Sequence, residues 1–349
     1  MAKVLIYNNF LRQGQDSILA PRQSKLHRYR SVGPGRWRAN PYGKTQHMGV
    51  KDLLRRIIAC VVLWFRWRKY DVLIVDGAVT GLFVSFISLL NKGHRKLVID
   101  SWNVPRRRKG FWKWFAGMLY QRVDFFFVHS RYDIQLTHRL YNLPEQRFVF
   151  RPFTRNEPAN GELEDAYLFE DRRPFVFSFG GNARDYRTFF RAIEGTDLYA
   201  IVVARQYNLE GLTIPDNVRA FCNIPLEVCD NLVRKCKYTV FTFDGSEPSC
   251  GQISIVTSFM TSKPVICTDW VGVEDYVTDG VNGILVKMGN ADDLRREMLK
   301  LSNDKQLYAR LSAGARNWSD KNADPLVIQR EIDGIVTSLT SPRIDNRNE

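Results

Sequence analysis

Short apolar runs and longer stretches with helical spacing alternate along the whole chain. Residues 71–75 (DVLIV) and 125–129 (FFFVH) are apolar at almost every position, and residues 50–69 have the spacing of a helix without an internal Pro. A strand that is apolar on both faces is typical of a parallel sheet covered by helices on both sides. The pattern therefore predicts an α/β fold.

The first half of the chain predicts one such sheet. Strands are expected at residues 3–7, 71–75, 96–100, 125–129 and 148–150, and helices at 50–69, 81–90, 111–122 and 132–141. Residues 12–47 are rich in Arg, Gly, Pro and Ser, and they predict a long irregular segment.

A second series of the same kind begins at residue 175. Strands are expected at 175–179, 198–203, 238–243, 265–267 and 284–286, and helices at 186–194, 226–235, 251–263, 291–302, 305–318 and 325–339. The acidic stretch 157–173 contains Pro and Gly, and we interpret it as a linker. The expected organisation is a first domain at 1–156, the linker 157–173, a second domain at 174–324, a last helix at 325–340 and a polar tail at 341–349.

Length and composition fit two globular domains. The chain has 349 residues, of which 44% are hydrophobic, enough for two cores. It contains no apolar run of roughly 18 residues, so no membrane-spanning helix is expected, and its N-terminus has no signal-peptide pattern. Six cysteines are scattered without metal-binding spacing, and we interpret them as reduced thiols in a cytoplasmic protein.

The chain is basic, with 51 Lys and Arg against 37 Asp and Glu and a formal net charge of +14. Such an excess favours an anionic partner, which is nucleic acid, an acidic membrane or a phosphorylated substrate. The densest cluster combines cations with tryptophans: Arg106, Arg107, Arg108, Lys109, Trp112 and Trp114. This mixture favours the headgroup region of an anionic bilayer. The alternative is a core helix with solvated ends, which we expect in part for the similar stretch 53–69.

The most specific pattern lies at residues 251–286. A helix that begins at Gly251 ends near residue 263, and a short strand, a turn around Gly272 and a short helix ending near Val277 follow it. A helix N-terminus presents unpaired N–H groups and a partial positive charge, so it binds phosphate. Gly251 permits close approach of a ligand, and Ser249 is the expected N-cap. The alternative is a tight turn without a ligand.

In order and spacing, these elements resemble the donor-nucleotide half of GT-B glycosyltransferases of the family 4 type, the glycosyl transferases group 1. The resemblance implies two Rossmann-like domains facing a central cleft, with an acceptor-binding first domain, a nucleotide-sugar-binding second domain and a C-terminal helix that crosses back to the first. In that family the Gly-led helix faces the donor phosphates and residues within it reach the ribose. Gly251, Gln252 and Ile253 are the matching positions here. No metal and no cofactor is expected besides the donor, a UDP- or GDP-sugar.

A second motif follows the strand at 175–179. Gly180, Gly181 and Asn182 precede Arg184 and the next helix, which is a plausible cradle for a pyrophosphate. The resemblance places Arg184 near the basic residue that neutralises the diphosphate leaving group, a role that a fixed cation fulfils when no metal is present. The alternative is a surface ion pair between Arg184 and Asp185. Arg205, after the next strand, is either a further donor contact or a solvated loop residue.

The acidic pair of the family, two Glu separated by seven residues, is not intact. Its positions fall on Ser249 and Thr257, and Glu247 lies just before the first. We expect Thr257 to hydrogen-bond a ribose hydroxyl as a neutral partner. A shift of the loop would let Glu247 replace the first acid.

In the first domain, Asp100 ends the strand at 96–100, after which many family members carry a His that this chain lacks. Asp100 has two interpretations: a catalytic base that deprotonates the acceptor hydroxyl, or a strand-end residue that forms a local turn. Ser130, after the following strand, is expected to cap a helix.

The leading hypothesis is a metal-independent glycosyltransferase that transfers a sugar to a lipid-linked or polysaccharide acceptor in surface glycan or glycolipid assembly. The resemblance also implies a peripheral enzyme at the inner face of the cell membrane. Three alternatives stay open: a degenerate non-catalytic GT-B subunit, a nucleotide-sugar epimerase and a basic nucleic-acid-binding protein. The last requires a basic stripe with an element that reads bases, and no such motif is visible, so no nucleic acid partner is expected.

Overall fold

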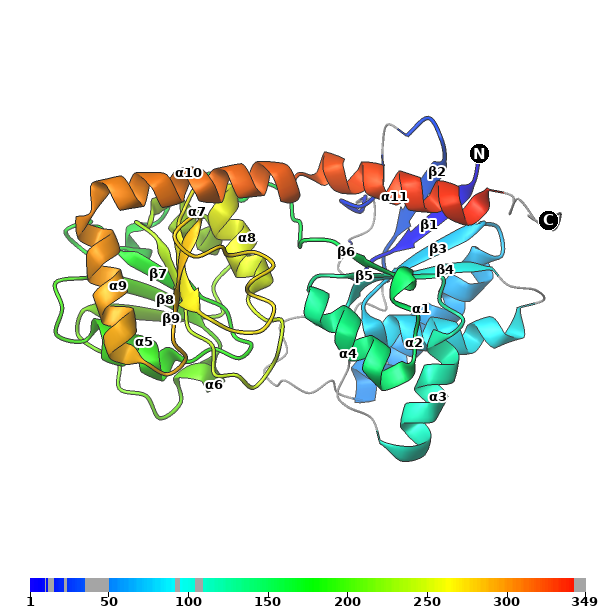
Figure 1. Ribbon diagram of the computed structural model, residues 1–349, viewed down its shortest axis with the longest axis horizontal. Helices are drawn as coiled ribbons and strands as arrows, with labels where there is room; N and C mark the ends of the chain where they lie inside the picture. Colours follow the sequence, from blue (N-terminus) through cyan, green and yellow to red (C-terminus); the bar gives the residue numbers. More distant parts are fainter. Residues whose placement is uncertain are drawn as a thin grey trace, which may run out of the picture. The chain divides into compact units, whose positions relative to one another are not determined.

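The computed structural model describes residues 1–9, 11, 16–21, 24–34, 50–91, 95–103 and 109–341, without the side chains of residues 50–53. The chain divides into two compact units (Figure 1). Unit 1 comprises Met1–Arg151 and Pro325–Glu349, and unit 2 comprises Pro152–Asp324. Each unit contains a six-stranded sheet whose strands pair in parallel. The predicted α/β class is therefore confirmed in both halves.

Unit 1 has the strand order β2-β1-β3-β4-β5-β6. The strands are β1 (Lys3–Tyr7), β2 (Arg28–Val32), β3 (Val72–Asp76), β4 (Lys96–Trp102), β5 (Phe125–Val128) and β6 (Phe148–Phe150). The helices are α1 (Val50–Trp67), α2 (Ala78–Ile87), α3 (Gly110–Tyr120), α4 (Arg131–Tyr141) and α11 (Pro325–Thr340), with the short 3-10 turns η2 (Ser88–Leu90) and η3 (Glu145–Arg147).

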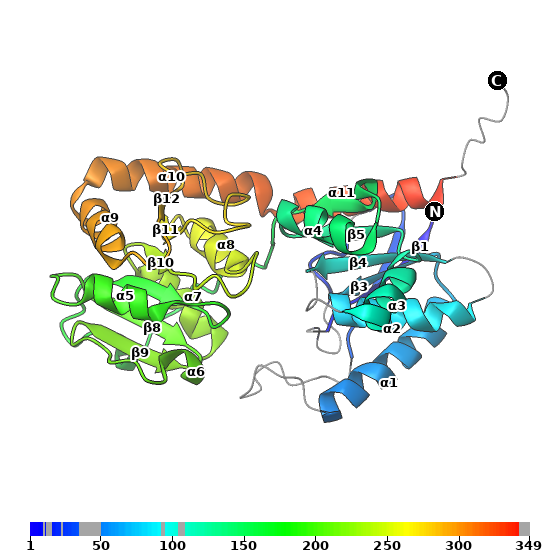
Figure 2. The ribbon, with the colours of Figure 1, turned by 60° about the horizontal axis from the view of Figure 1, so that its bottom comes forward.

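Alternate side chains of this sheet enter two separate cores, which explains why the inner strands are apolar at most positions. Leu5 of β1 packs in the core that α1, α2 and α3 cover. Its neighbour Val4 packs in the core on the opposite face, against α11. Figure 2 shows α11 on one side of β3 and β4 and the three other helices on the other side.

The last helix belongs to unit 1, as expected for the C-terminal helix of a GT-B fold. Ile328, Ile332 and Val336 follow one another at helical spacing, and all three are buried against the sheet. Polar contacts fix the same helix at its sides, since Asp333 accepts a hydrogen bond from Tyr29 at 2.5 Å and Gln329 donates one to the carbonyl of Ile18 at 2.8 Å.

One strand of unit 1 differs from the prediction. β2 lies within residues 12–47, which we expected to be irregular, and pairs in parallel with β1 at the edge of the sheet. Its sequence, RYRSV, contains no fully buried side chain. An edge strand that is solvated on its outer side lacks the continuous apolar run by which the inner strands are recognised.

Unit 2 has the strand order β12-β11-β10-β7-β8-β9. The strands are β7 (Val176–Phe179), β8 (Ala200–Ala204), β9 (Val218–Cys222), β10 (Thr239–Phe241), β11 (Val265–Thr268) and β12 (Gly283–Val286). The helices are α5 (Tyr186–Ile193), α6 (Gln206–Leu209), α7 (Leu226–Lys235), α8 (Gln252–Met260), α9 (Ala291–Asn303) and α10 (Lys305–Asn322), and η4 (Asp165–Tyr167) is a 3-10 turn.

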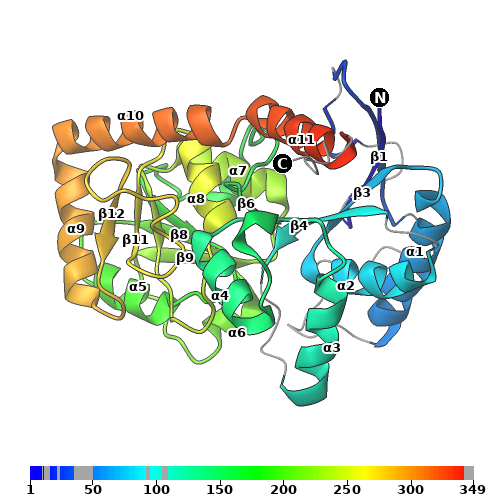
Figure 3. The same cartoon turned by 45° about the vertical axis from the view of Figure 1, so that its right-hand side comes forward.

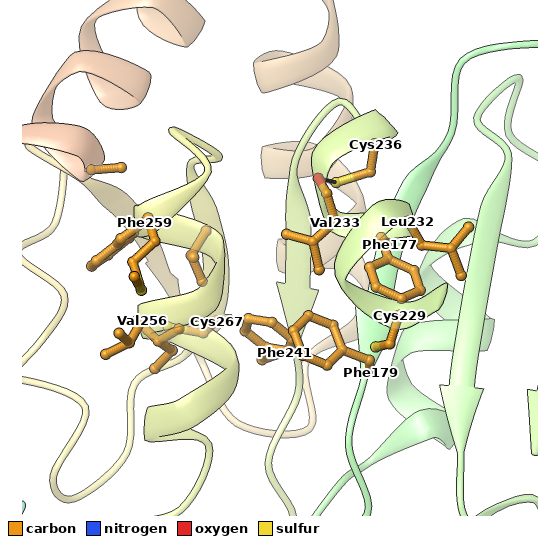
Figure 4. Packing of buried hydrophobic residues seen from close by; sticks show 14 of the residues in the cluster. Phe177, Phe179, Cys229, Leu232, Val233, Cys236, Phe241, Val256, Phe259 and Cys267 are labelled. Carbon is orange, nitrogen blue, oxygen red and sulfur yellow. Dashed lines mark hydrogen bonds between the residues drawn. The ribbon is translucent and has the colours of Figure 1, made fainter. Parts of the chain in front are cut away.

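Aromatic side chains fill the core of unit 2 beneath α7 and α8 (Figure 4). The ring centroids of Phe177 and Phe179 lie 5.0 Å apart, and that of Phe241 lies 5.2 Å from Phe179. Figure 4 shows these rings of β7 and β10 beside Leu232 of α7, with Phe259 of α8 in the same cluster. α5 and α9 cover the opposite face.

Two further segments differ from the prediction. The stretch 157–173 is not a separate linker, because Leu163 and Leu168 are buried in the core of unit 2. The expected short helix ending near Val277 is a series of turns, in which the N–H groups of Val273 and Tyr276 bond to carbonyls only three residues before them.

The topology of each sheet identifies the edge where a ligand is expected. In open parallel sheets, ligands bind at the carboxyl ends of the strands, where neighbouring strands continue in opposite directions. In unit 1 this switch point lies between β1 and β3, and in unit 2 it lies between β7 and β10.

Candidate functional site

Arg184 lies at the switch point of unit 2. It follows the loop after β7, and its backbone forms an isolated bridge with Phe243, which follows β10. Its side chain is buried, with 8% exposed. The alternative of a surface ion pair with Asp185 therefore does not hold. Asp185 instead caps α5 by accepting a hydrogen bond from the N–H of Thr188 at 3.0 Å.

Neutral oxygens hold the guanidinium of Arg184. It donates to the carbonyls of Phe179 at 3.3 Å and Asn182 at 3.1 Å, and to Ser254 Oγ at 3.1 Å. Within the described ranges, no carboxylate forms an ion pair with it. Burial lowers the pKa of Arg184, but a guanidinium keeps its proton in proteins. The result is a buried positive charge that an anionic ligand would stabilise.

The guanidinium of Arg184 fits here because two neighbouring residues are glycines without side chains. A Cβ atom at Gly180 would lie 2.6 Å from Nη2 of Arg184, and one at Gly251 would lie 3.4 Å from Nη1 and 2.4 Å from Cζ of Phe243. Both glycines also have positive φ angles, 123° and 83°, in a region that favours glycine. The guanidinium thus lies between the loop after β7 and the N-terminus of α8.

The N-terminus of α8 carries no side-chain cap. Gly251 is its N-cap residue, and the first turn contains no acidic residue. Gln252 is half-buried and Ile253 is 49% exposed at this end of the helix. Gly251 has no side chain with which to cap this end of the helix, and a helix N-terminus without such a cap is an arrangement that binds phosphate.

The prediction that Ser249 caps α8 is wrong. The helix begins after Gly251, and Ser249 lies in the preceding turn with a φ angle of 54°. Its N–H donates to the carbonyl of Val271 at 3.0 Å. Its Oγ is buried without a hydrogen-bond partner in the described part of the chain. This hydroxyl lies close to the N-terminus of α8 and can still form a hydrogen bond, which buried polar groups normally do.

The loop after β8 packs against the same glycine pair. A Cβ atom at Gly181 would lie 2.6 Å from Cγ of Arg205, and Asn208 donates to the Gly181 carbonyl at 2.9 Å. Arg205 itself donates to Asn223, which follows β9, at 2.8 Å, so its side chain has a protein partner instead of being freely solvated. Asn182 is exposed beside the pair.

Thr257 is buried, and its hydroxyl already has partners within unit 2. Its side chain is 0% exposed. Its hydroxyl donates to the carbonyl of Ile253 at 2.7 Å and accepts a hydrogen bond from Arg155 at 3.0 Å. Arg155 also forms a two-bond ion pair with Asp230, at 2.9 and 2.6 Å. Sequence reasoning missed Arg155 and Asp230, because no local pattern links residues so far apart in the chain.

Glu247 lies in the exposed loop that follows β10. Trp270 Nε1 donates to its backbone carbonyl at 3.0 Å. This bond fixes the backbone of the loop, and the carboxylate is left at the surface of unit 2.

A second polar cluster lies at the carboxyl edge of the unit 1 sheet. Asp100 of β4 is 3% exposed and forms an ion pair with Arg151, which is 2% exposed and follows β6. Asp100 is therefore not a strand-end residue that only forms a local turn, and its role as a catalytic base stays a prediction. Its register partner on β3 is Asp76, to which Asn9 donates a hydrogen bond at 3.2 Å. Burial, together with the charge of Asp100, raises the pKa of Asp76 to about 6.

His129 joins this cluster from the end of β5. Its Nδ1 lies 2.8 Å from the carbonyl of Arg151, and its Nε2 lies 3.2 Å from Ser101 Oγ. A carbonyl only accepts, so Nδ1 carries the proton and Nε2 is the acceptor in the neutral ring. Burial and the charge of Arg151 lower the pKa of His129 to about 4. As expected, Ser130 caps α4 by accepting from Tyr132 N at 3.2 Å.

Part of the basic and aromatic cluster of the first half can be placed. Lys109 is exposed just before α3, and Trp112 and Trp114 on α3 are 63% and 62% exposed. Arg106, Arg107 and Arg108 lie outside the described residues. The tryptophans are therefore surface residues instead of core residues.

Among the described residues, no group of three or more His, Cys, Asp or Glu side chains is placed to hold a metal ion, and no helix is long and apolar enough to cross a membrane. A cavity of about 560 Å³ lies at the amino edge of the unit 1 sheet, lined in part by Lys96, Asp124 and Arg147. It is at the opposite end of the strands from Asp76 and Asp100.

Comparisons of the sequence with known proteins indicate a class for unit 2. Residues 205–318 match the family model described as Glycosyl transferases group 1. Over 91 residues the chain is 32% identical to an uncharacterized glycosyltransferase of Methanocaldococcus jannaschii. That match spans about a quarter of each protein, 26% of this chain and 25% of the relative.

Solved structures resemble the chain over nearly its whole length. HepE of Anabaena, solved in complex with UDP and glucose, has a TM-score of 0.69 at 14% identity, with 97% of this chain and 100% of that chain covered. Sucrose-phosphate synthase from Thermosynechococcus elongatus has a TM-score of 0.70 at 11% identity, with 97% and 99% covered. At such identities the likeness concerns the fold. The chain thus has the GT-B fold, and residues 205–318 of its unit 2 match the model of the glycosyl transferases group 1.

Proposed function

We propose that the protein is a metal-independent glycosyltransferase. It transfers a sugar from a nucleotide donor, a UDP- or GDP-sugar, to a hydroxyl group of a lipid-linked or polysaccharide acceptor in surface glycan or glycolipid assembly. Unit 2 binds the donor and unit 1 binds the acceptor. The observation that carries the proposal is Arg184, a buried cation without a carboxylate partner in the described ranges, placed between a glycine loop and an uncapped helix N-terminus.

This arrangement suits the leaving group of the reaction. When the bond between the sugar and the diphosphate breaks, negative charge develops on the nucleoside diphosphate, and fixed donors that already point at it lower the barrier. Arg184 supplies a full charge, and the first turn of α8 supplies N–H groups. These groups fulfil the role that a divalent cation has in other enzymes, so the proposal requires no metal.

Three further observations bear on the nature of the donor and the acceptor. HepE of Anabaena, which shares the fold, was solved with UDP-glucose, and this favours a UDP-sugar. The net charge of +14 and the exposed tryptophans of α3 favour an acceptor at an anionic membrane surface, which the enzyme approaches as a peripheral protein.

A second candidate is a non-catalytic subunit that binds a nucleotide without transferring a sugar. It is favoured by one observation: neither position of the acidic pair carries an acid, and Thr257 is closed off by Arg155. The two candidates agree on nucleotide binding and differ on turnover.

Two experiments test the proposal: the first measures nucleotide binding and the second measures turnover. Thermal-shift titrations with UDP, GDP, ADP and CMP, with and without EDTA, are expected to give a selective shift that EDTA does not change, because a ligand of the native state raises the melting temperature. Release of the matching nucleoside diphosphate from a panel of its sugar donors then separates an enzyme from a silent binder. No shift with any nucleotide would contradict both candidates, and a shift without turnover would favour the second.

A further inference from the structure

α1 presents two apolar faces. Its inner face, which includes Leu63 and Trp67, is buried in the core of unit 1. The other face is exposed to solvent: Leu54 is 53% exposed, Ile58 37%, Val61 39%, Val62 40% and Phe65 56%. These positions recur at helical spacing and form one stripe. For residues 53–69 we expected, in part, a core helix with solvated ends, and the structure shows a buried inner face together with an apolar outer side.

The neighbouring helices continue this exposed surface. α1, α2 and α3 cover the same face of the sheet (Figure 3), so their sides that point away from that core belong to one outer layer. The exposed apolar side chains beyond α1 are Phe86 (51%), Leu89 (45%), Leu90 (69%), Phe111 (62%), Trp112 (63%) and Trp114 (62%). The rings of Phe86 and Phe115, 6.0 Å apart, join α2 to α3. Contiguous apolar surface of this extent marks an interaction site.

The charge of this layer identifies its partner. This layer carries Arg55, Arg66, Arg68, Lys69, Lys109 and Lys113. Residues 54–69, 78–91 and 109–120 contain no Asp or Glu. A second copy of the chain would bring the same positive charge against it, which is unfavourable. Anionic lipid headgroups complement the charge, and acyl chains accept the apolar side chains.

We propose that α1 lies in the plane of an anionic membrane, with Ile58, Val62 and Phe65 inserted below the headgroups. α2 and α3 extend the same contact. Arginine stems are suited to this position: Arg68 Cζ lies 4.0 Å from the ring centroid of Trp64, so the stem packs on apolar surface while the charge reaches the headgroups. The inference extends the membrane association proposed above from α3 to α1, and it is independent of the donor site in unit 2.

The test is flotation of the full chain with vesicles of phosphatidylcholine alone or with about one third phosphatidylglycerol. The variants are Ile58→Ser/Phe65→Ser on α1, Trp112→Ala/Trp114→Ala on α3 and, as a control, Leu226→Ser. Leu226 is 61% exposed on α7 of unit 2, so its replacement matches the α1 changes in exposure and polarity. UDP affinity and the melting temperature report whether each variant is folded.

We expect the wild-type chain and the control to float with the anionic vesicles and to be released by high salt, because the attraction of the headgroups is screened. The α1 variant is expected to lose binding at least about tenfold, the amount that removing apolar contacts worth about 1.4 kcal/mol produces. If the α1 variant binds the anionic vesicles as strongly as the wild-type chain does, the inference is overturned, although the contact through α3 would stand. Absence of wild-type binding, or a wild-type dimer that the α1 changes dissociate, would overturn it as well.

Discussion

Nη2 of Arg184 donates a hydrogen bond to Ser254 Oγ at 3.1 Å. This bond joins the loop after β7 to the first turn of α8, two elements that are far apart in the sequence. It orients a guanidinium whose other bonds go to carbonyl oxygens of its own loop. The bond therefore fixes the guanidinium of Arg184 relative to the N-terminus of α8. These are the two groups that we propose to bind a diphosphate.

Loss of this bond has a modest predicted effect. Ser254→Ala removes a single hydrogen bond to a charged group, worth about 1.5 kcal/mol, so we expect UDP to bind roughly tenfold more weakly. Calorimetry of the variant measures the change. Ser258→Ala on the next turn of α8, where Oγ accepts a hydrogen bond from Thr239, is the control, and we expect it to lower stability without changing the affinity for UDP. If the Ser254 variant binds UDP as tightly as the wild-type chain does, the bond does not orient the site.

Gly251 is predicted to be required for both the fold of the turn and the ligand. Gly251→Ala places a Cβ atom 2.4 Å from Phe243 in a residue with a φ angle of 83°, so the N-terminus of α8 must shift. Gly195→Ala is the matched control, because Gly195 has a φ angle of 70° with nothing within 4 Å of the added atom. Both variants are expected to lose about 1–2 kcal/mol of stability. Only the change at Gly251 is expected to weaken UDP binding, by tenfold or more, and equal affinities in a binding titration would contradict this.

Thr257 is predicted to be irrelevant to the ribose. Its hydroxyl is already bonded to Ile253 and Arg155, so Thr257→Val should leave the ratio of affinities for UDP and 2′-deoxy-UDP unchanged. A loss of stability of about 1 kcal/mol is expected, because Arg155 loses one acceptor. If the variant no longer distinguished the two nucleotides while the wild-type chain did, the hydroxyl would contact the ribose in the complex.

Asp76 is predicted to make stability depend on pH. Its pKa rises from 3.8 to about 6 in the folded chain because of burial. A carboxyl with a raised folded pKa stabilises the fold fully below its unfolded pKa, and this contribution is lost as pH rises through the folded value. The shift corresponds to about 3 kcal/mol above pH 6.

Asp76→Asn keeps the shape of the side chain and removes the titration. We expect the variant to be more stable than the wild-type chain at pH 8 and to lose that advantage near pH 4, as measured by urea unfolding at both pH values. Asp71→Asn, at an exposed residue just before β3, is the control for a carboxylate next to the same strand. A stability difference that does not change with pH would show that Asp76 ionises normally.

Much of the fold was predictable because the inner strands are apolar on both faces and therefore stand out as continuous runs. β2 was not, since RYRSV is an edge strand without a buried residue. The stretch 157–173 has the composition of a linker, and only the burial of Leu163 and Leu168 shows that it packs on unit 2.

The candidate site was predictable where it follows local patterns. Gly180, Gly181 and Arg184 form a recognisable sequence of strand, glycines, cation and helix, and the structure brings Arg184 to Gly251. The environment of Thr257 was not predictable, because Arg155 and Asp230 reach it from distant parts of the chain. The partners of Asp100 were hidden for the same reason, although the Asp at the end of β3 is a signal that could have drawn attention to Asp76.

The central claim is that Arg184 binds the diphosphate of a nucleotide donor. Calorimetric titration of UDP, in EDTA, into the wild-type chain, Arg184→Ala and Arg187→Ala tests it most directly, Arg187 being an exposed arginine of α5. We predict that the wild-type chain and the Arg187 variant bind UDP equally. The Arg184 variant should lose at least about a hundredfold, as expected when a buried charge-assisted contact worth about 3 kcal/mol is removed. UDP affinity in a folded Arg184 variant equal to that of the wild-type chain would contradict the account.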